Sequence, residues 1–491
     1  MKRILLVIGV LGCFTKAESA RAQGLLPLPG LRSSGGVEAL LEQAEEAYQQ
    51  GEFARCLELT NQIIQRHPQN HTALYLRASA RAEWGSQTGD ITMLRQGIED
   101  ARQALSYGGT RVVRYYLPYF YAMTNLAELE HKPQHAEVVV EFAGKVLARP
   151  DLENEDRANI LYQRGRAYEV LDKPQEALKD YDQAVRIFPN QLAAQLNQAA
   201  LLAALGRDAE AEAVFSSAIA QHRDDPTPYN NRGMFYQQRE RYTLAKADFT
   251  QALQRDPTFI IAYINRAYTS LLMDQYAEAE ADLTTALRYD PQHVSVYHLR
   301  GLVKLSAGKA VEALADFEQA RRLQPQQPQF LADLGFAHFF AGNILQAAQT
   351  WETAVTQQPQ LNYLDPWRYW ALLRAGKRDQ AQSIVSVWES QGWSPTNWPG
   401  QLLAFLASRI DGESLESAAR LGAQGQPTTD QDPVSRDKLC EAYYFQALKL
   451  QQEGHTTAAR DMFVRAKQTK RKHLNAYRGA CYALGDFQPV K

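Results

Sequence analysis

The sequence has few cysteines, no block of like charge and only one long apolar run. Four cysteines stand among 491 residues, and no pair has the spacing of a zinc site. The formal net charge of −2 is spread along the chain, which argues against nucleic-acid binding. Phosphate-binding glycine loops, nucleophile elbows and paired His–Glu motifs are also missing. We therefore expect no catalysis, no cofactor and no metal.

The apolar run lies at the start of the chain, where two basic residues precede residues 4–14. It is too short for a comfortable membrane span, which needs about 20 apolar residues. An Ala-Arg-Ala cleavage site follows at 20–22, so residues 1–22 resemble a bacterial secretory signal and the exported chain begins at Gln23. Two alternatives stay open. Lipidation of Cys13 or an uncleaved signal would attach the protein to a membrane.

Prolines and small residues recur at an interval of 34 residues. The prolines are Pro257, Pro291, Pro325 and Pro359, and the small residues are Ala199, Gly233, Ala267, Gly301 and Gly335. Between them, alanines flank a bulky residue at the i, i+3, i+4, i+7 spacing of a buried helix face. Each unit is therefore predicted to be two antiparallel helices ending at the proline, and the chain an all-α solenoid. The pattern resembles the tetratricopeptide repeat family, which implies a right-handed superhelix with a concave, peptide-binding inner face.

An arginine in the first helix is followed sixteen residues later by an aspartate in four units. The pairs are Arg164–Asp180, Arg232–Asp248, Arg266–Asp282 and Arg300–Asp316. Both members change together where Gln198 faces Val214, so we expect a contact across the helix pair. Arg77 should likewise meet Asp100 if residues 85–91 are an insertion. These charges are then structural, rather than a strip that recruits a ligand.

The repeat interval divides the chain into segments. They are a signal peptide at 1–22, a linker at 23–36, divergent repeats at 37–150, a regular array at 158–395, a helical segment and loop at 396–435, and a terminal repeat with a capping helix at 436–491. Residues 112–157 match the pattern poorly, and Tyr115 to Tyr121 is unusually aromatic.

The family resemblance directs attention to the first helix of each unit, which lines the inner face. The candidate partner-binding residues there are Asn197, Asn231, Asn265, Arg166, Met234 and Tyr268. Carboxamides one repeat apart can hydrogen-bond the main chain of an extended peptide, since each offers a donor and an acceptor. We expect the other three side chains to be exposed beside them. Asparagine is also common at this point in the family, which is the alternative explanation.

Tryptophans crowd the region from 351 to 398. The candidates for a second surface are Trp367, Trp370, Trp393 and Trp398. Aromatic anchors are favoured at interfaces, and these could also stack on a saccharide. The alternative, which we favour, is a packed junction between the array and the carboxyl-terminal segments.

After removal of a signal, three cysteines remain, Cys56, Cys440 and Cys481. We expect buried free thiols. A bond between Cys440 and Cys481 is the alternative.

The last part of the chain carries a narrower resemblance. Trp398-Pro399, the helix through Phe405, residues 439–444 and Gly454 are similar to the end of NlpI-type tetratricopeptide proteins. Those are bacterial envelope lipoproteins that dock peptidoglycan hydrolases and a periplasmic protease. The resemblance implies a non-catalytic envelope scaffold whose partners are other proteins. The alternatives are a structural or self-assembling envelope lipoprotein and a saccharide-binding accessory protein.

Overall fold

The computed structural model describes residues 36–108, 112–390, 392, 397–422 and 425–486. Over these ranges the regular structure is helical, and a single isolated bridge joins Leu421 to Pro427. The predicted signal, Cys13 and Trp393 lie outside the described residues. The chain divides into two compact units, with the boundary after Phe259. The predicted all-α solenoid of helix pairs is confirmed.

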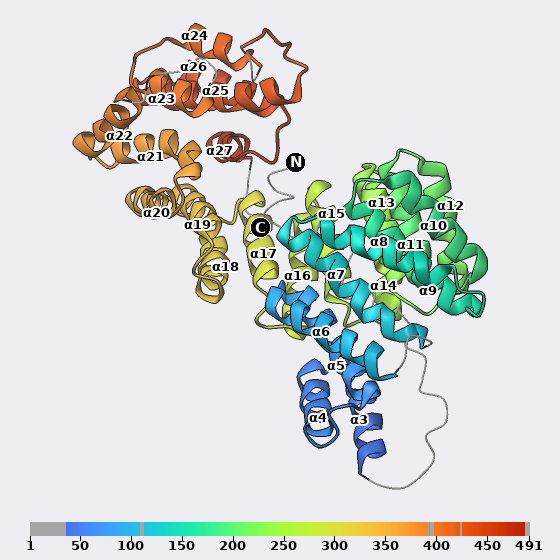
Figure 1. Ribbon diagram of the computed structural model, residues 1–491. Helices are drawn as coiled ribbons and strands as arrows, with labels where there is room; N and C mark the ends of the chain where they lie inside the picture. The colour runs from blue at the N-terminus through green and yellow to red at the C-terminus, as the bar shows by residue number, and fades with distance from the viewer. Residues whose placement is uncertain (1–35, 109–111, 391, 393–396, 423–424, 487–491) are drawn as a thin grey trace. The chain divides into compact units, whose positions relative to one another are not determined.

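The amino-terminal unit is built of successive antiparallel helix pairs (Figure 1). Its helices are α3 (Val37–Gln49), α4 (Phe53–Arg66), α5 (His71–Thr88), α6 (Ile91–Gly108), α7 (Tyr116–Glu130), α8 (Gln134–Leu147), α9 (Asn154–Val170), α10 (Pro174–Ile187), α11 (Leu192–Ala204), α12 (Asp208–Gln221), α13 (Thr227–Gln238) and α14 (Tyr242–Arg255), with a short 3₁₀ turn, η1 (Val113–Tyr115), before α7. Each helix packs against the next along the chain, and alternate helices also touch.

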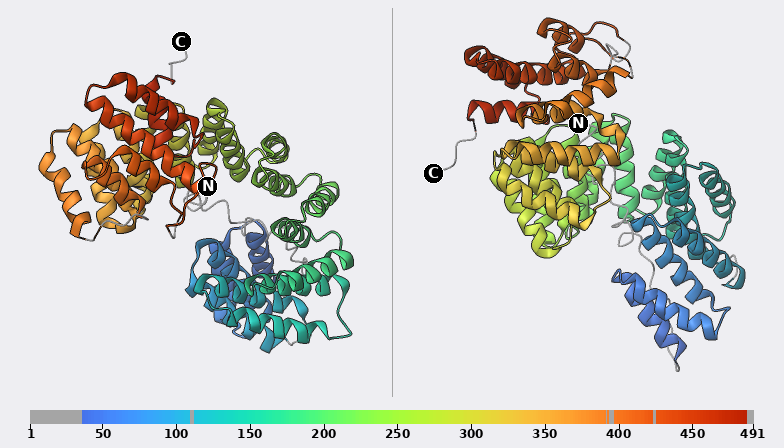
Figure 2. Two further views of the ribbon diagram at one scale, coloured as in Figure 1. Left: turned by 90° about the horizontal axis from the view of Figure 1, so that it is seen from above. Right: turned by 90° about the vertical axis from the view of Figure 1, so that its left-hand side faces the viewer.

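The carboxyl-terminal unit continues the same arrangement (Figure 2). Its helices are α15 (Ile260–Leu272), α16 (Tyr276–Tyr289), α17 (Val294–Ser306), α18 (Ala310–Leu323), α19 (Pro328–Phe340), α20 (Ile344–Gln357), η2 (Pro359–Leu364), α21 (Asp365–Arg374), α22 (Arg378–Ser390), α23 (Trp398–Leu406), α24 (Gly412–Ala419), α25 (Pro433–Gln452), α26 (Thr456–Gln468) and α27 (Asn475–Leu484). One apolar cluster runs from α17 to α27.

The 34-residue interval also marks where helices end. The residue before each periodic proline leaves the helix for an extended conformation, as at Asp256 with φ −131° and ψ 97°, because proline disfavours the helical region for its predecessor. The first helix of a pair ends instead at a left-handed residue. Glycine fills this position at Gly206 and Gly308, whereas Glu240 adopts φ 59° there with a side chain.

The column of small residues is explained by the aromatic residue of the second helix. A Cβ atom added at Gly233 would lie 2.7 Å from Cε1 of Phe249, and one at Gly301 would lie at the same distance from Phe317. Both rings are completely buried. The two helices of a pair therefore approach closely only where the facing position is small.

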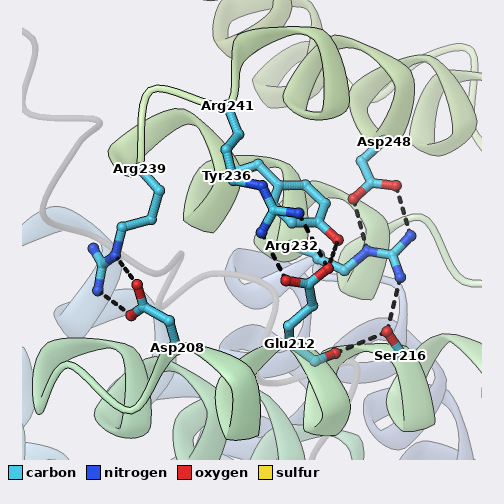
Figure 3. Close-up of polar contacts among 8 residues, drawn as sticks. All are labelled: Asp208, Glu212, Ser216, Arg232, Tyr236, Arg239, Arg241 and Asp248. Carbon is cyan, nitrogen blue, oxygen red and sulfur yellow. Dashed lines mark hydrogen bonds and ion pairs between the residues drawn. The ribbon is translucent and has the colours of Figure 1, made fainter.

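The predicted arginine–aspartate contacts are confirmed. Arg232 donates from Nε and Nη2 to the two carboxylate oxygens of Asp248, both at 2.8 Å (Figure 3). Arg77 reaches Asp100 in the same manner, at 2.9 and 2.6 Å. The residues inserted after Gly85 extend α5 and α6 to 18 residues each, and the pair still forms. These bidentate bonds lock the helices of one pair together.

Figure 3 also shows polar contacts that join one pair to the next. Arg241 and Tyr236 both bond the Glu212 carboxylate of α12, each at 2.7 Å. Arg239 bonds Asp208 at 2.6 Å, near the start of α12. The charges in this region are paired within the array, as expected for a structural role.

The tryptophans support the packed-junction explanation. Trp367 and Trp370 are 2% and 3% exposed, and the Trp367 ring contacts Phe336 and Phe445 with centroids 5.0 Å apart. Trp398 is half-buried and donates from Nε1 to Glu441 at 2.6 Å, which ties α23 to α25. The three described cysteines are buried free thiols, as expected.

The last helix, α27, packs on α25 and α26 and also reaches earlier helices of its own unit. The buried Arg478 donates to Ser306 Oγ of α17 at 3.1 Å. The Tyr482 ring stacks on Phe340 of α19, with centroids 4.8 Å apart and planes 3° from parallel. The end of the carboxyl-terminal unit is thereby fastened to its interior.

Candidate binding surface on the first helices

The first helices of the amino-terminal unit touch one another in sequence, with α5 against both α3 and α7, and α7 against α9. They enclose a small, partly open cavity with a volume of about 30 Å³. Its polar and aromatic lining comes from all four helices and includes Tyr48, Glu83, Tyr121, Asn159, Tyr162 and Gln163. One water molecule needs about 10–15 Å³ of cavity volume, so this cavity can hold about two. The cavity is therefore large enough for one small functional group, and a longer ligand would have to extend beyond it.

Glu83 is the one acidic residue in this lining, and only 2% of it is exposed. Its described hydrogen bond, 3.4 Å long, comes from Gln87 Nε2. Burial raises the pKa of the Glu83 carboxyl to about 7, although the bond from Gln87 and the charge of Arg166 oppose the rise. A carboxylate in this setting is stabilised by any cation that reaches it.

Arg166 lies on α9, near Glu83. The prediction that its side chain is exposed is wrong. Only 8% of the residue is exposed, because α7 covers it. The guanidinium carbon lies 4.9 Å from the centre of the Tyr121 ring, and Nη2 donates to Asn125 Oδ1 at 3.3 Å. The Nη1 atom is buried without a partner, as is the Oε1 atom of Gln163.

Two of the three predicted asparagines lie on first helices of this unit. Asn231 is buried on α13, and its Oδ1 atom has no hydrogen-bond partner. Asn197 is half-buried on α11 near Tyr181, whose pKa is raised well above its usual range by burial, an effect that Asn197 partly offsets. Asn265 lies on α15, in the carboxyl-terminal unit, and is buried.

Met234 and Tyr268 are also buried rather than exposed, with 1% and 8% of each residue accessible. The Met234 sulfur accepts a contact from Asn230 Nδ2 at 3.7 Å. The sequence spacing identified which helix face these residues occupy, but it does not report how deeply neighbouring helices cover that face.

Sequence reasoning missed Glu83, Gln163 and Asn159. Glu83 precedes the insertion and takes the position that Gln238, Leu272 and Ser306 occupy in regular units, so the repeat pattern does not mark this position as acidic. Two signals were available: the aromatic run from Tyr115 to Tyr121, which supplies Tyr121 to the cavity, and the 34-residue interval, which places Gln163 in the column of Asn197 and Asn231.

The chemistry of this surface is compatible with binding a polar ligand. A buried polar atom without a partner costs about 1–3 kcal/mol, and a ligand that pairs with it recovers part of that energy. Within the described ranges, no group of His, Cys, Asp or Glu side chains is arranged to hold a metal ion. None of the described helices has the length and apolar character needed to cross a membrane.

Comparison with protein families identifies the repeats. Residues 158–191, 226–259 and 273–328 match models of the tetratricopeptide repeat. Residues 31–102 match a model described as alkyl sulfatase dimerisation. No curated protein matches the chain. The first three segments are thus tetratricopeptide repeats, and they lie within the all-α solenoid of helix pairs.

The chain also shows partial similarity to solved structures, including those of PilW, YrrB and yeast Tom70. PilW, a type IV pilus biogenesis factor, is 25% identical, with a TM-score of 0.37 over 41% of this chain and 94% of its own. YrrB, a tetratricopeptide protein with an unusual peptide-binding site, is 20% identical, with a TM-score of 0.32 over 36% and 92%. Yeast Tom70 is 15% identical, with a TM-score of 0.39 over 85% and 89%.

Proposed function

We propose that the protein is a scaffold of the bacterial periplasm or cell envelope, and that it captures an extended segment of a partner protein on the first helices of its amino-terminal unit. Tetratricopeptide repeats are in general non-enzymatic protein-interaction scaffolds. The secretory-signal pattern in residues 1–22 supports export, and the resemblance of the last helices to NlpI-type proteins supports an envelope setting.

The observation that carries this proposal is the set of buried polar atoms without partners on α9 and α13. They are Gln163 Oε1, Arg166 Nη1 and Asn231 Oδ1. An extended peptide presents main-chain N–H and C=O groups at regular spacing, so it can satisfy both the amide oxygens and the guanidinium. A ligand of this kind has its affinity set by the backbone and its specificity by a few side-chain pockets.

Affinity capture from envelope extracts, with the chain from Gln23 to Lys491 as bait, tests the proposal. Arg166→Gln combined with Asn231→Ala should abolish recovery of the specific partner. Lys179→Gln is the matched control, because it also removes one positive charge but from an exposed site on α10. Equal recovery by all three proteins, or no specific recovery by wild type, would contradict groove capture. Cell fractionation of wild type and Cys13→Ser distinguishes a periplasmic protein from one held by a lipid.

Self-association is a second candidate function, favoured by the match of residues 31–102 to a dimerisation model. Sedimentation equilibrium at micromolar concentration tests it, since a monomer mass would reject it. Saccharide binding through Trp367 or Trp370 is disfavoured, because both rings are packed in the core and offer no face for stacking, whereas Trp398 is half-buried.

A further inference from the structure

The cavity between α3, α5, α7 and α9 has an unusual balance of groups. Its deepest charged group is the Glu83 carboxylate, and the unpartnered Oε1 atom of the buried Gln163 is a second acceptor in its lining. Tyr48, Tyr121 and Tyr162 supply aromatic rings from three different helices. Carboxylate, amide oxygen and aromatic faces are the groups that attract a compact cation.

The Glu83 charge is not neutralised by direct contact with an arginine or lysine. Across the described part of the chain, no cationic side chain lies within ion-pair distance of its carboxylate. The nearest candidate, Arg166, is directed to the Tyr121 ring and Asn125 instead. A buried carboxylate that lacks a counter-ion is costly, and a ligand can supply that counter-ion.

From these contacts we propose that the cavity binds the ammonium group of a lysine side chain in the partner segment. This inference rests on the proposed function, which places the segment along the same helices. The cavity volume of about 30 Å³ accommodates an ammonium group and its last methylene but excludes a planar guanidinium with its flanking carbons. The aliphatic stem then lies against the tyrosine rings at the cavity mouth.

The ionisation of Glu83 gives the site a pH signature. Its pKa of about 7 means that the carboxyl is partly protonated at neutral pH. Burial raises the pKa of Tyr48 and Tyr121 above their usual range, so both stay neutral between pH 6 and 8, and Arg166 stays charged. Ammonium binding therefore strengthens from pH 6 to pH 8, as the carboxylate forms.

Isothermal titration of the purified protein with n-butylammonium chloride tests the site. Wild type should bind n-butylammonium and not 1-butanol, and Glu83→Gln should reduce the affinity at least tenfold. Gln163→Leu removes the second acceptor and should weaken binding severalfold. The matched control Glu137→Gln alters an exposed carboxylate on α8 and should change nothing. Unfolding curves of each variant establish that it is folded.

Two further probes distinguish the source of the ammonium group. Nα-acetyl-lysine methylamide should bind more tightly than alanine methylamide, whose only ammonium is a main-chain amino group. The reverse order would overturn the lysine assignment. If n-butylammonium does not bind, the cavity holds water alone and the proposed ammonium site is wrong. Equal binding by wild type and Glu83→Gln would also overturn the proposed site. If wild type captures a partner but binds no ammonium, only this inference fails. Failure of capture refutes the proposed function instead.

Discussion

Replacement of Gly335 by alanine provides a sharp test of how the helix pairs pack. A Cβ atom at this position in α19 would lie 2.8 Å from Cε2 of Trp351 and closer still to its indole nitrogen. Trp351 is completely buried, and its Nε1 donates to the carbonyl of Ala332 at 2.9 Å. The ring must move, and the hydrogen bond is then lost.

The expected cost follows from three effects. Overpacking a core costs about 1–3 kcal/mol, and a buried donor and acceptor left unpaired cost about 1–3 kcal/mol. Alanine has a better helix propensity than glycine, which offsets about 1 kcal/mol of the lost stability. The net expectation is a loss of about 3 kcal/mol in the stability of α19 and α20. Gly144→Ala is the control, because the nearest atom to its new Cβ lies 3.9 Å away, so it should stabilise α8 by about 0.5–1 kcal/mol.

Native-state hydrogen exchange is the appropriate assay, since solenoids open locally rather than all at once. Protection of amides in α19 and α20 should fall by roughly a hundredfold in Gly335→Ala, which corresponds to that loss. Adding Trp351→Phe should restore part of it, because Ala199 and Phe215 already occupy these positions in α11 and α12. Unchanged protection in Gly335→Ala, or no rescue by the second change, would refute this explanation of the small-residue column.

Three other predictions concern ionisable groups. The described cysteines should resist a disulfide reagent at pH 8 until the protein unfolds, because burial raises their thiol pKa values to about 11–12; rapid labelling of the folded Cys13→Ser protein would contradict this. The pKa of Glu83 is about 7 in the folded protein and near 4.5 in the unfolded chain, so the folded state binds this proton more tightly. The resulting stabilisation is complete below pH 4.5 and is lost as the pH rises through 7. Urea unfolding should therefore show wild type losing about 2–3 kcal/mol relative to Glu83→Gln between pH 5 and 8, and equal pH slopes would contradict it. Asp316 holds both Arg300 and Lys304, at 2.6 and 2.9 Å, so Asp316→Asn should cost about 3 kcal/mol in chemical denaturation, and a loss within error of zero would count against the pair.

The regular array was predictable because the 34-residue interval fixes several kinds of residue at once. Proline, glycine and the arginine–aspartate pairs each report a different contact, and all of them lie in one repeating frame. The Arg77–Asp100 pair could be predicted even across an insertion, since its geometry constrains the facing helices.

The candidate site was less predictable for a physical reason. Sequence spacing gives the direction in which a side chain points, whereas its exposure depends on how closely neighbouring first helices approach. Arg166 and Met234 point to the predicted face but are covered there. Glu83 stands where regular units have Gln238, Leu272 or Ser306, so the repeat interval does not mark it as a functional acid.

The most direct test of the account is site-specific photo-crosslinking in bacterial cells. A photoreactive amino acid at Leu117, a half-buried position that lines the cavity on α7, should crosslink to a discrete partner protein. The same amino acid at Val138, which is 42% exposed on α8, should give no such product. Crosslinks at Val138 alone, or equal products at both positions, would contradict capture on the first helices.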